Sequence, residues 1–343
     1  MNSPKYSVLI PSYQTDPSLL SRCLKSILDQ KRDDVEIVLV EALFNGESSF
    51  RQTVFLHDPH ISYVVSDKAS APFQRNLTLE KARGKYLVFV DSDDFISPDF
   101  FSFADQSLLS FPNADLIVFN HTSGMDFYQG RFSSSDFVYT PDHLELEKWF
   151  GCFKHQGPDF QGRSVWGKIF KKSIVDQFSL KFDLSLPSNQ DHFFVMHYLN
   201  HCERAVIAEK YRLYHFDISP FSMSPKASTN SPERVSKILE AWQAFFEEER
   251  PSRIRRLDWA YNVVGFYIPR MMNYYFCSPQ ETRNKKTLRN LFIQTLRSPT
   301  FRAAIKTCRF SCCLNRKKRF QLLLLKIKWY SSYFNLYWRL YKK

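Results

Sequence analysis

The sequence predicts an α/β protein with a mostly parallel sheet flanked by helices, followed by a mainly helical C-terminal region. Two observations predict this fold. In the first 120 residues, short apolar runs typical of strands alternate with segments whose apolar residues repeat at helical spacing. Such alternation is typical of parallel sheets covered by helices on both faces. After Ser231 the chain shows a helical pattern to its end, with breaks at Pro251, Pro279 and Pro299.

The alternating region contains five predicted strands and three predicted helices. The first helix is expected to have Asp16 at its N-cap and Pro17 at its first helical position, where these residue types are favoured. The second helix has Pro72 in its first turn and Gly84 as its C-terminal stop, and the third starts near Pro98. The predicted strands are residues 6–10, 35–40, 61–65, 85–90 and 115–120.

The pattern becomes irregular between residues 121 and 225. This part is expected to contain a short helix at 141–150, a helix starting near Ser188 and a short strand at 204–208, and the segment 164–178 is given no element. We therefore predict one domain over residues 1–225 and a second, helical region over residues 226–343.

Charge is distributed unevenly along the chain. From Thr282 to the end there are 17 Lys and Arg residues and no acidic residue, which leaves 30 basic and 35 acidic residues, or a net charge of −5, in the first 281. An acidic body and a basic tail indicate two surfaces with different partners. The seven cysteines form no CxxC pair, which suits a reducing compartment. We recognise no signal peptide or bilayer-spanning segment, so we expect a cytoplasmic protein that is at most peripheral to a membrane.

The segment "LVFVDSDD" at residues 87–94 places three carboxylates directly after the fourth predicted strand. Like charges at this spacing repel one another, so a cation is expected there. Asp91 and Asp93 could share a divalent cation and leave coordination positions open for substrate oxygens, at the sheet edge where ligands bind. The alternative is that these residues form an N-cap cluster that starts the next helix, since Asp favours helix starts.

Six blocks occur in the order and spacing of one enzyme family. They are "SVLIPSY", "SILDQ", "EIVLVE", "QRNLTLEKARGKYLVFVDSDDFISPDF", "VWGKIFKKSIV" and "NQDHFF". Over roughly residues 5–225 the sequence resembles the family 2 inverting glycosyltransferases, in particular bacterial members that build surface polysaccharides and teichoic acids. The resemblance implies a GT-A (Rossmann-like) fold, with about 1–120 binding a nucleotide sugar and 121–225 forming the acceptor side. It also implies transfer of a sugar from a nucleotide diphosphate to a hydroxyl, with Mn²⁺ or Mg²⁺ as cofactor.

The resemblance implies donor-binding residues near several strand ends. Glu41 and Ala42 stand where the family shows Asp-Asp or Asn-Asp to hold the base, so Ala42 lacks the second acid. Arg75 matches an arginine that contacts the base or diphosphate, and Asp91 and Asp93 match the D-x-D pair for ribose and metal. The full donor set is Pro11, Ser12, Tyr13, Glu41, Arg75, Asp91, Ser92 and Asp93, and the expected donor is a UDP-sugar.

Asp191 matches the catalytic base of the family's Glu-Asp motif, in which Gln190 replaces the Glu. An inverting transfer needs a proton acceptor for the attacking hydroxyl, and a well-placed carboxylate meets that need. Near the start of a helix, Asp191 would also stay ionised. The alternative is that Asp191 only caps this helix.

Three further residues each have a functional and a structural interpretation. Trp166 and Lys168 could line the acceptor side, since aromatic faces suit sugar rings, or could pack inside the fold. His215 could contact metal or phosphate, a role that GT-A enzymes often give to a C-terminal-side histidine. The alternative, which we favour, is a structural histidine on an apolar strand.

The basic tail also combines cations with aromatic side chains. Such a segment could lie in a membrane interface, with its cations on anionic lipid. It could also pack its aromatics into a helical subdomain and leave a basic face in solvent. Single-stranded nucleic acid is a third candidate partner, which we do not expect. The aromatic residues are Phe320, Trp329, Tyr330, Phe334, Tyr337 and Trp338, and the densest cation cluster is Arg316, Lys317, Lys318 and Arg319.

Two other functional classes compete with a glycosyltransferase. A phosphoryl-transfer enzyme could use the acids of "DSDD", although that chemistry favours Thr or Val where Phe95 stands. A non-catalytic nucleic-acid-binding protein could act through the tail, but this leaves the strand-end carboxylates without a role. For the glycosyltransferase we expect a surface-glycan or lipid-linked acceptor, and an anionic membrane surface as a candidate partner of the tail.

Overall fold

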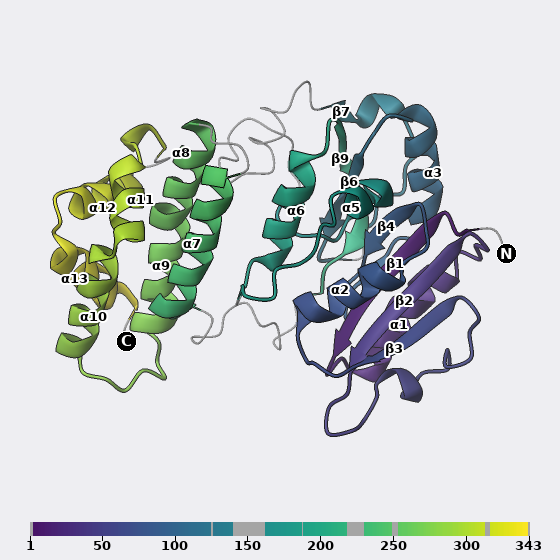
Figure 1. Cartoon of the computed structure of the whole chain (residues 1–343), viewed down its shortest axis with the longest axis horizontal. Helices are drawn as coiled ribbons and strands as arrows, with labels where there is room; N and C mark the ends of the chain where they lie inside the picture. The colour runs from purple at the N-terminus through teal and green to yellow at the C-terminus, as the bar shows by residue number, and fades with distance from the viewer. Residues whose placement is uncertain are drawn as a thin grey trace. The chain divides into compact units, whose positions relative to one another are not determined.

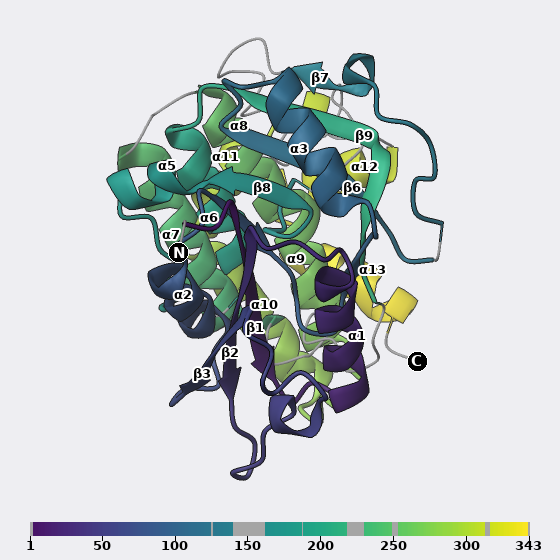
Figure 2. The ribbon, with the colours of Figure 1, turned by 90° about the vertical axis from the view of Figure 1, so that its right-hand side faces the viewer.

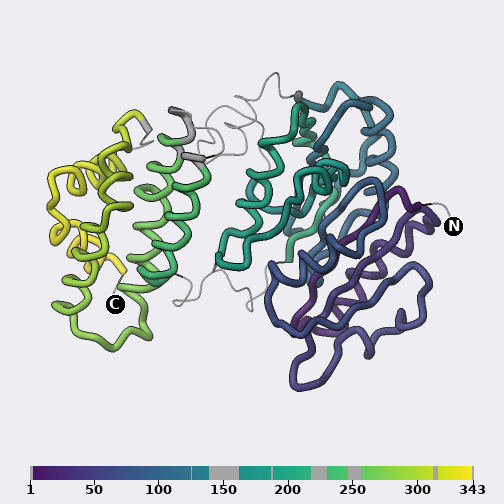
Figure 3. Tube along the Cα trace, viewed as in Figure 1, coloured from purple at the N-terminus to yellow at the C-terminus, as the bar shows by residue number. Residues whose placement is uncertain are grey.

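The computed structural model describes residues 3–124, 126–139, 162–186, 188–217, 230–248, 253–312 and 316–341 (Figure 3). Contacts within the chain divide it into two compact units. Unit 1 comprises Met1–Phe150, Gln156–Leu184 and Gln190–Ser219, and unit 2 comprises Gly151–His155, Ser185–Asn189 and Pro220–Lys343. The helix expected at 141–150 and the domain boundary expected at 225/226 fall outside the described residues, so both stay predictions.

Unit 1 is built around a mixed sheet in which nine strands are described. Along the sheet the order is β3-β2-β1-β4-β8-β6-β9-β5, and β7 pairs with β9. Helices flank this sheet, so the predicted α/β fold class is confirmed (Figure 1). The strands are β1 (Tyr6–Tyr13), β2 (Val35–Ala42), β3 (Ile61–Ser66), β4 (Tyr86–Phe89), β5 (Phe95–Ile96), β6 (Leu116–Thr122), β7 (Val138–Tyr139), β8 (Lys168–Lys171) and β9 (Ala205–His215).

The predicted parallel arrangement holds for one half of the sheet. β1 pairs in parallel with β2 and β4, and β2 pairs in parallel with β3. The other half is mixed, because β8 runs antiparallel to both β4 and β6, while β6 and β9 are parallel. β5 and β7 also pair antiparallel with β9. A strand of four residues such as β8 is too short for its sequence pattern to reveal its direction.

Helices lie on both faces of the parallel half. α1 (Pro17–Leu28) and α2 (Ala71–Lys81) lie on opposite sides of β1, β2 and β3 (Figure 2). The predicted N-cap of α1 is confirmed, since the Asp16 carboxylate accepts a hydrogen bond from the Ser18 amide at 2.8 Å. The other helical segments described in this unit are α3 (Phe100–Ser110), α5 (Lys172–Gln177), α6 (Gln190–Asn200) and the 3-10 turns Phe50–Gln52 and Ser134–Asp136.

Gly84 does not end α2, contrary to the sequence prediction. The helix ends at Lys81, and the Ala82 amide caps it by donating to the Thr78 carbonyl. Gly84 instead permits a close approach between two segments, because a Cβ there would lie 2.6 Å from the backbone nitrogen of Ser7. Its amide donates to the Ser7 hydroxyl at 2.8 Å, which fixes the loop before β4 against β1.

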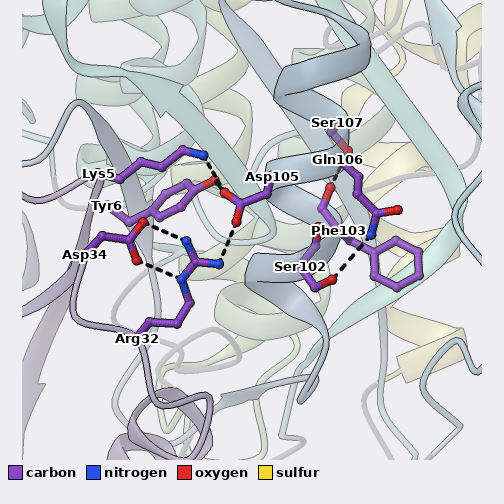
Figure 4. A network of polar contacts seen from close by, with 9 residues as sticks. All are labelled: Lys5, Tyr6, Arg32, Asp34, Ser102, Phe103, Asp105, Gln106 and Ser107. Carbon is purple, nitrogen blue, oxygen red and sulfur yellow. Dashed lines mark hydrogen bonds and ion pairs between the residues drawn. The ribbon is translucent and has the colours of Figure 1, made fainter.

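A charged cluster ties the amino-terminal end of β1 to α3 (Figure 4). Asp105 of α3 accepts hydrogen bonds from Lys5 Nζ at 2.5 Å and from Tyr6 OH at 2.7 Å. Arg32 donates to Asp105 at 2.6 Å and forms a bidentate pair with Asp34 at 2.8 and 2.6 Å. Burial favours a higher pKa for the Asp105 carboxyl, but these hydrogen bonds bring its pKa below the ordinary value.

The described part of unit 2 is mainly helical, as predicted for the C-terminal region. Pro279 lies between two helical segments, and Pro299 opens a new helix, a position that proline favours. The elements are α7 (Pro232–Glu248), α8 (Arg253–Asn262), α9 (Ile268–Arg270), α10 (Lys285–Arg297), α11 (Pro299–Thr307), α12 (Arg316–Lys326), α13 (Tyr330–Tyr341), the π-helical segments η4 (Val263–Tyr267) and η5 (Met271–Phe276), and the 3-10 turn η6 (Phe310–Cys312).

Much of the aromatic tail packs into the core of unit 2. Tyr333 and Phe334 of α13 are fully buried, and their ring centroids lie 5.8 and 5.7 Å from that of Phe292 in α10. Phe320 and Trp329 differ, since they are 52% and 61% exposed. The packing interpretation is therefore confirmed for α13, whereas membrane docking stays a prediction. No helix in the described ranges combines the length and apolarity that crossing a bilayer requires.

Candidate active site

The carboxyl ends of β1 and β2 lie side by side. β1 runs past its predicted end, so Pro11, Ser12 and Tyr13 lie inside the strand and pair with the last three residues of β2. Proline is tolerated at this point because the β1–β4 ladder ends at Leu9. Ser12 is buried, whereas Tyr13 is 42% exposed and can meet a ligand at this edge.

Side chains that the sequence analysis did not identify hold this edge together. Gln74 of α2 donates through Nε2 to the carbonyl oxygens of Ser12 and Val40, which joins β1 to β2. The hydroxyl of Thr15, just after β1, lies 2.6 Å from that of Ser92 in the "DSDD" segment. Gln74 and Thr15 are ordinary polar residues in the sequence, and only the fold brings them to the strand ends.

Glu41, a predicted donor-binding residue, points into the protein and is 1% exposed. Its carboxylate accepts hydrogen bonds from the Tyr63 hydroxyl at 2.8 Å and the Ser49 amide at 2.7 Å. The Ser48 hydroxyl and the Phe50 amide also donate to it. These bonds fix the loop after β2, and the contact of Glu41 with a nucleotide base stays a prediction.

Arg75 joins two predicted site carboxylates through one side chain. Its Nη1 donates to Asp191 Oδ1 at 2.6 Å, and its Nη2 donates to Asp91 Oδ1 at 2.8 Å. The guanidinium is almost fully buried and lies 5.6 Å from the ring centroid of Phe182. Because a guanidinium presents its donors in a rigid plane, Arg75 sets the separation of the two carboxylates.

Charge and burial shift the pKa values of this cluster. Burial opposes the charge of Arg75, but Asp191 and Asp91 raise its pKa above the ordinary value. Burial raises the pKa of the Asp191 carboxyl, and the positive charges of Arg75 and Lys168 oppose this rise. A carboxyl with a raised pKa is a better proton acceptor than one in water. The ion pair with Arg75 also goes beyond the role of a helix cap, which was the alternative for Asp191.

The "DSDD" segment forms a turn, and the interpretation as a helix N-cap is wrong. The Asp94 amide donates to the Asp91 carbonyl at 3.0 Å, and β5 follows at once. Helix α3 begins only at Phe100, with Asp99 at its N-cap. The carboxylates of the turn therefore do not cap the amides at the start of a helix.

Residues from α1 and β9 hold this turn, and the sequence analysis identified none of them. The Tyr214 hydroxyl and the Asp217 amide donate to the buried Asp94 carboxylate at 2.6 and 2.8 Å. Arg22 donates to the Asp93 carbonyl at 2.7 Å and pairs with the Asp217 carboxylate at 2.7 Å. Tyr214 and Asp217 lie beyond the strand expected at 204–208, and no local pattern places Arg22 of α1 beside this turn.

Asp91 and Asp93 fit a divalent cation. Arg22 donates to the backbone carbonyl of Asp93, and Arg75 donates to Oδ1 of Asp91. The Asp93 carboxylate and Oδ2 of Asp91 are therefore the groups that a cation can contact. Burial and the charge of Asp91 raise the pKa of the Asp93 carboxyl, and a cation would relieve that repulsion. Mg²⁺ is commonly held by one or two carboxylates, with substrate phosphates and water as further ligands. Within the described ranges, no group of three or more His, Cys, Asp or Glu forms a complete metal site.

Trp166 and Lys168, predicted on the acceptor side, are packed inside unit 1. Trp166 is 9% exposed, and its ring stacks on Tyr214 with centroids 4.7 Å apart. Lys168 is 1% exposed, and its Nζ donates to the Ser164 carbonyl at 2.7 Å. The structural interpretation accounts for these contacts. The charge of Lys168 acts on Asp191, and an acceptor contact stays a prediction for both residues.

His215, the third predicted metal ligand, is buried and stacks on Phe95 with ring centroids 4.1 Å apart. Its Nδ1 lies 2.8 Å from the Gly124 carbonyl oxygen. Since a carbonyl only accepts, Nδ1 carries the proton, and Nε2 of the neutral ring is the nitrogen that can bind a metal. Phe95 comes two residues after Asp93, so the pairing of β5 with β9 brings His215 near the motif. Ligation of a metal by His215 stays a prediction.

We expect Arg75→Met to lower the free energy of unfolding by about 2–3 kcal/mol, because it leaves two partly buried carboxylates without their shared cation. Urea unfolding followed by circular dichroism measures this change. Lys25→Met is the matched control, since its pair with Asp29 is 64% and 60% exposed. Loss of such a pair should cost less than about 0.5 kcal/mol. Equal destabilisation by the two substitutions would contradict a stabilising role for the Arg75 cluster.

The family follows from a comparison with known proteins. Residues 7–177 match the family model described as Glycosyl transferase family 2. The chain carries a family 2 glycosyltransferase domain. The matched segment of this glycosyltransferase contains Arg75 and the D-x-D pair but ends before Asp191. The role of Asp191 therefore depends on the geometry around Arg75.

Individual relatives agree with this family. The glycosyltransferase is similar to the putative glycosyltransferase EpsH of Bacillus subtilis (strain 168), with 25% identity over 255 residues that span 72% of this chain and 71% of EpsH. Its fold is similar to that of S. aureus TarS residues 1–349 in complex with UDP-GlcNAc, with a TM-score of 0.66 and 16% identity over 97% of this chain and 90% of that TarS fragment. It is also similar to the mannosyltransferase PcManGT from Pyrobaculum calidifontis, solved with GDP-Man and Mn²⁺ (TM-score 0.53, 14% identity, 98% and 88% coverage).

The protein is therefore an enzyme that transfers a sugar from a nucleotide sugar. The comparisons do not favour the phosphoryl-transfer enzyme or the nucleic-acid-binding protein as alternatives.

Proposed function

We propose that this glycosyltransferase inverts the anomeric carbon of the sugar, with Asp191 as the base and Asp91 and Asp93 on the donor side. The two ion pairs of Arg75 are the main support for this proposal, because they hold Asp91 and Asp191 close together. Inversion needs that proximity, since the acceptor hydroxyl attacks from the face opposite the leaving diphosphate while the base takes its proton.

The two carboxylate oxygens of Asp191 have different roles in the proposed step. Arg75 engages Oδ1 of Asp191, so Oδ2 is the atom that receives the proton of the acceptor hydroxyl. The hydroxyl oxygen forms a bond to the anomeric carbon as the bond from that carbon to the diphosphate breaks, and the electron pair leaves with the nucleoside diphosphate. Arg75 keeps Asp191 oriented throughout, and the raised pKa of the Asp191 carboxyl favours the proton transfer.

Asp91 and Asp93 would hold Mn²⁺ or Mg²⁺ at the strand end, and His215 is a further candidate ligand. When bound, such an ion neutralises the charge that develops on the leaving diphosphate. The chemistry of the two carboxylates supports this assignment, as does the similarity to a mannosyltransferase solved with Mn²⁺.

A UDP-sugar is the proposed donor, supported by the similarity to TarS in complex with UDP-GlcNAc. Ala42 lacks the second acid that holds the base in the family, so the choice of base needs a direct test. A panel of UDP-, GDP- and dTDP-sugars with Mn²⁺ should reveal release of nucleoside diphosphate from one UDP-sugar above all others. Preference for a GDP- or dTDP-sugar would overturn the donor assignment, and no release from any member would contradict the proposed enzyme.

The proposed acceptor is a hydroxyl of a surface glycan or lipid-linked glycan, reached at the inner face of the cell membrane. The exposed side of α12 supports this location. Phe320 and Leu323 are three residues apart on one helix face and are 52% and 42% exposed, and Trp329 beyond the helix is 61% exposed. These apolar groups lie in a segment with 17 basic and no acidic residues after Glu281, a combination that favours anionic lipid.

We expect the full chain to bind phosphatidylglycerol vesicles at low salt and to be released as salt rises, since the Debye length shortens to about 8 Å at 0.15 M. Replacing Phe320 and Trp329 together with Ser should weaken binding by about tenfold or more, because two apolar side chains no longer enter the interface. Cosedimentation with vesicles measures the binding.

The matched control for vesicle binding removes exposed apolar side chains from unit 1. Val54 and Leu109 are 90% and 81% exposed, and their joint replacement with Ser should leave binding unchanged. Absence of vesicle binding at low salt, or an equal loss in this control, would rule out docking through α12.

A further inference from the structure

A pocket in unit 2 gathers cationic and hydroxyl groups that the proposed transfer does not use. Its volume is about 280 Å³, and its lining contains two lysines, two tyrosines and a glutamine but no acidic residue. This volume is near the lower end of the range for small-molecule sites, about 300–1,000 Å³. The polar lining residues are Tyr261, Lys317, Lys318, Gln321 and Tyr337.

The pocket lies where the helical chain departs from regular α-helix. Pro269 has no N–H and cannot bond the carbonyl four residues earlier, at Gly265. The chain widens here into the π-helical segment η4, in which the Ile268 amide donates to the Val263 carbonyl five residues back. Gly265 also lines the pocket, and a Cβ there would lie 3.2 Å from the Tyr261 ring, so glycine lets this ring lie close to the backbone. Such irregular turns often occur at functional sites.

Hydrogen bonds orient the polar groups of the pocket. Lys318 Nζ donates to the Tyr261 hydroxyl at 3.2 Å and lies 5.6 Å from the centroid of the Tyr261 ring. Gln321 Nε2 donates to the Tyr337 hydroxyl at 3.1 Å. Lys317 precedes Lys318 on α12 and is the second lysine of the lining. The aromatic rings supply an apolar wall beside this polar edge.

We propose that this pocket binds the phosphate group of a phosphate ester. The lysines of the lining match an anion with several acceptor oxygens, and charge-assisted hydrogen bonds to such an anion are strong. Tyrosine hydroxyls and a glutamine amide can bond further oxygens of the ester. No acidic residue is among the residues that line the pocket, so the lining favours an anion over a cation. The phosphate can belong to a soluble ester or to a lipid headgroup.

The test compares two double substitutions that remove the same charge from the same helix. Lys317→Gln with Lys318→Gln removes both pocket cations, whereas Arg316→Gln with Arg319→Gln removes two neighbours outside the pocket lining. Calorimetry of the full chain measures binding of sn-glycerol 3-phosphate, with glycerol as the neutral control. Cosedimentation measures binding to phosphatidylglycerol vesicles. Thermal unfolding verifies that each variant is folded, and Lys317→Gln alone replaces the pocket double if that variant unfolds.

We expect the pocket double to weaken binding of sn-glycerol 3-phosphate by about tenfold or more and the arginine double to change it by less than about twofold. On vesicles both doubles lose general attraction to anionic lipid, and a headgroup site adds a further loss in the pocket double alone. Selective loss of glycerol 3-phosphate binding would assign the pocket to a soluble ester. Selective loss confined to vesicles would assign it to a lipid headgroup. If neither probe binds the unmodified chain, or if the two doubles weaken both probes equally, the pocket is not a phosphate site and the cations act only through their total charge.

Discussion

Asp191→Asn should lower the rate of sugar transfer by about 10³-fold and leave donor affinity within a few-fold. The substitution removes the proton acceptor but keeps an oxygen that can accept from Arg75. Arg75 can therefore still bond residue 191 and Asp91 together. Because Asp191 is assigned to the chemical step, the loss should appear in kcat and not in the dissociation constant of the donor. Single-turnover transfer measures the step, and calorimetry with the UDP-sugar measures donor binding.

Two companion variants sharpen this test. Asp191→Glu keeps a base but displaces it by one methylene, so we expect intermediate activity. Asp176→Asn removes an exposed carboxylate of α5 that pairs with Lys172, and it should leave transfer unchanged. Loss of donor binding in Asp191→Asn with no change in the chemical step would show that Asp191 serves the donor and that another residue is the base.

Local signals in the sequence predicted most elements of unit 1. The five strands predicted in the first 120 residues are present, and the Asp16 cap and Pro17 mark the start of α1, because caps and strand hydrophobicity act over a few residues. Gly84 shows the limit of that approach. A glycine after a helix usually ends it, yet this one is needed for the approach of Ser7 from another strand, which no local pattern contains.

The site shows the same division between local and long-range information. The position of Asp91 and Asp93 follows from the strand that precedes them. Arg75 was expected to contact the donor, and its bonds to Asp91 and Asp191 could not be foreseen because they join three distant segments. Tyr214 escaped notice because β9 continues past its apolar start into a less regular sequence.

Asp93→Asn should leave the free energy of unfolding unchanged or slightly higher, while nearly all transfer is lost. Burial and the charge of Asp91 make the ionised carboxylate unfavourable in the free protein, so a neutral side chain of the same shape relieves repulsion. The same change removes a charged ligand from the proposed cation site, where Mg²⁺ would be held by only one or two carboxylates. Electron paramagnetic resonance of bound Mn²⁺ and urea unfolding measure the two effects separately. Full activity in EDTA, or of the Asp93→Asn variant, would contradict the role of Asp93 as a metal ligand.

The next residue, Asp94, supplies the matched comparison, because it differs in hydrogen bonding. Burial and the charge of Asp91 raise the pKa of the Asp94 carboxyl to about 8, as they also raise that of Asp93. The Asp94 carboxylate, however, accepts from both the Tyr214 hydroxyl and the Asp217 amide inside the fold. An amide offers only one accepting oxygen, so Asp94→Asn should leave one donor without a partner and cost about 1–3 kcal/mol. The same substitution at two adjacent positions should therefore have different effects on stability. Asp93→Asn should give a stable, inactive protein, and Asp94→Asn should give a destabilised one. If both destabilise the fold equally, Asp93 is a structural residue like Asp94, and the turn is not arranged to present a carboxylate to a cation.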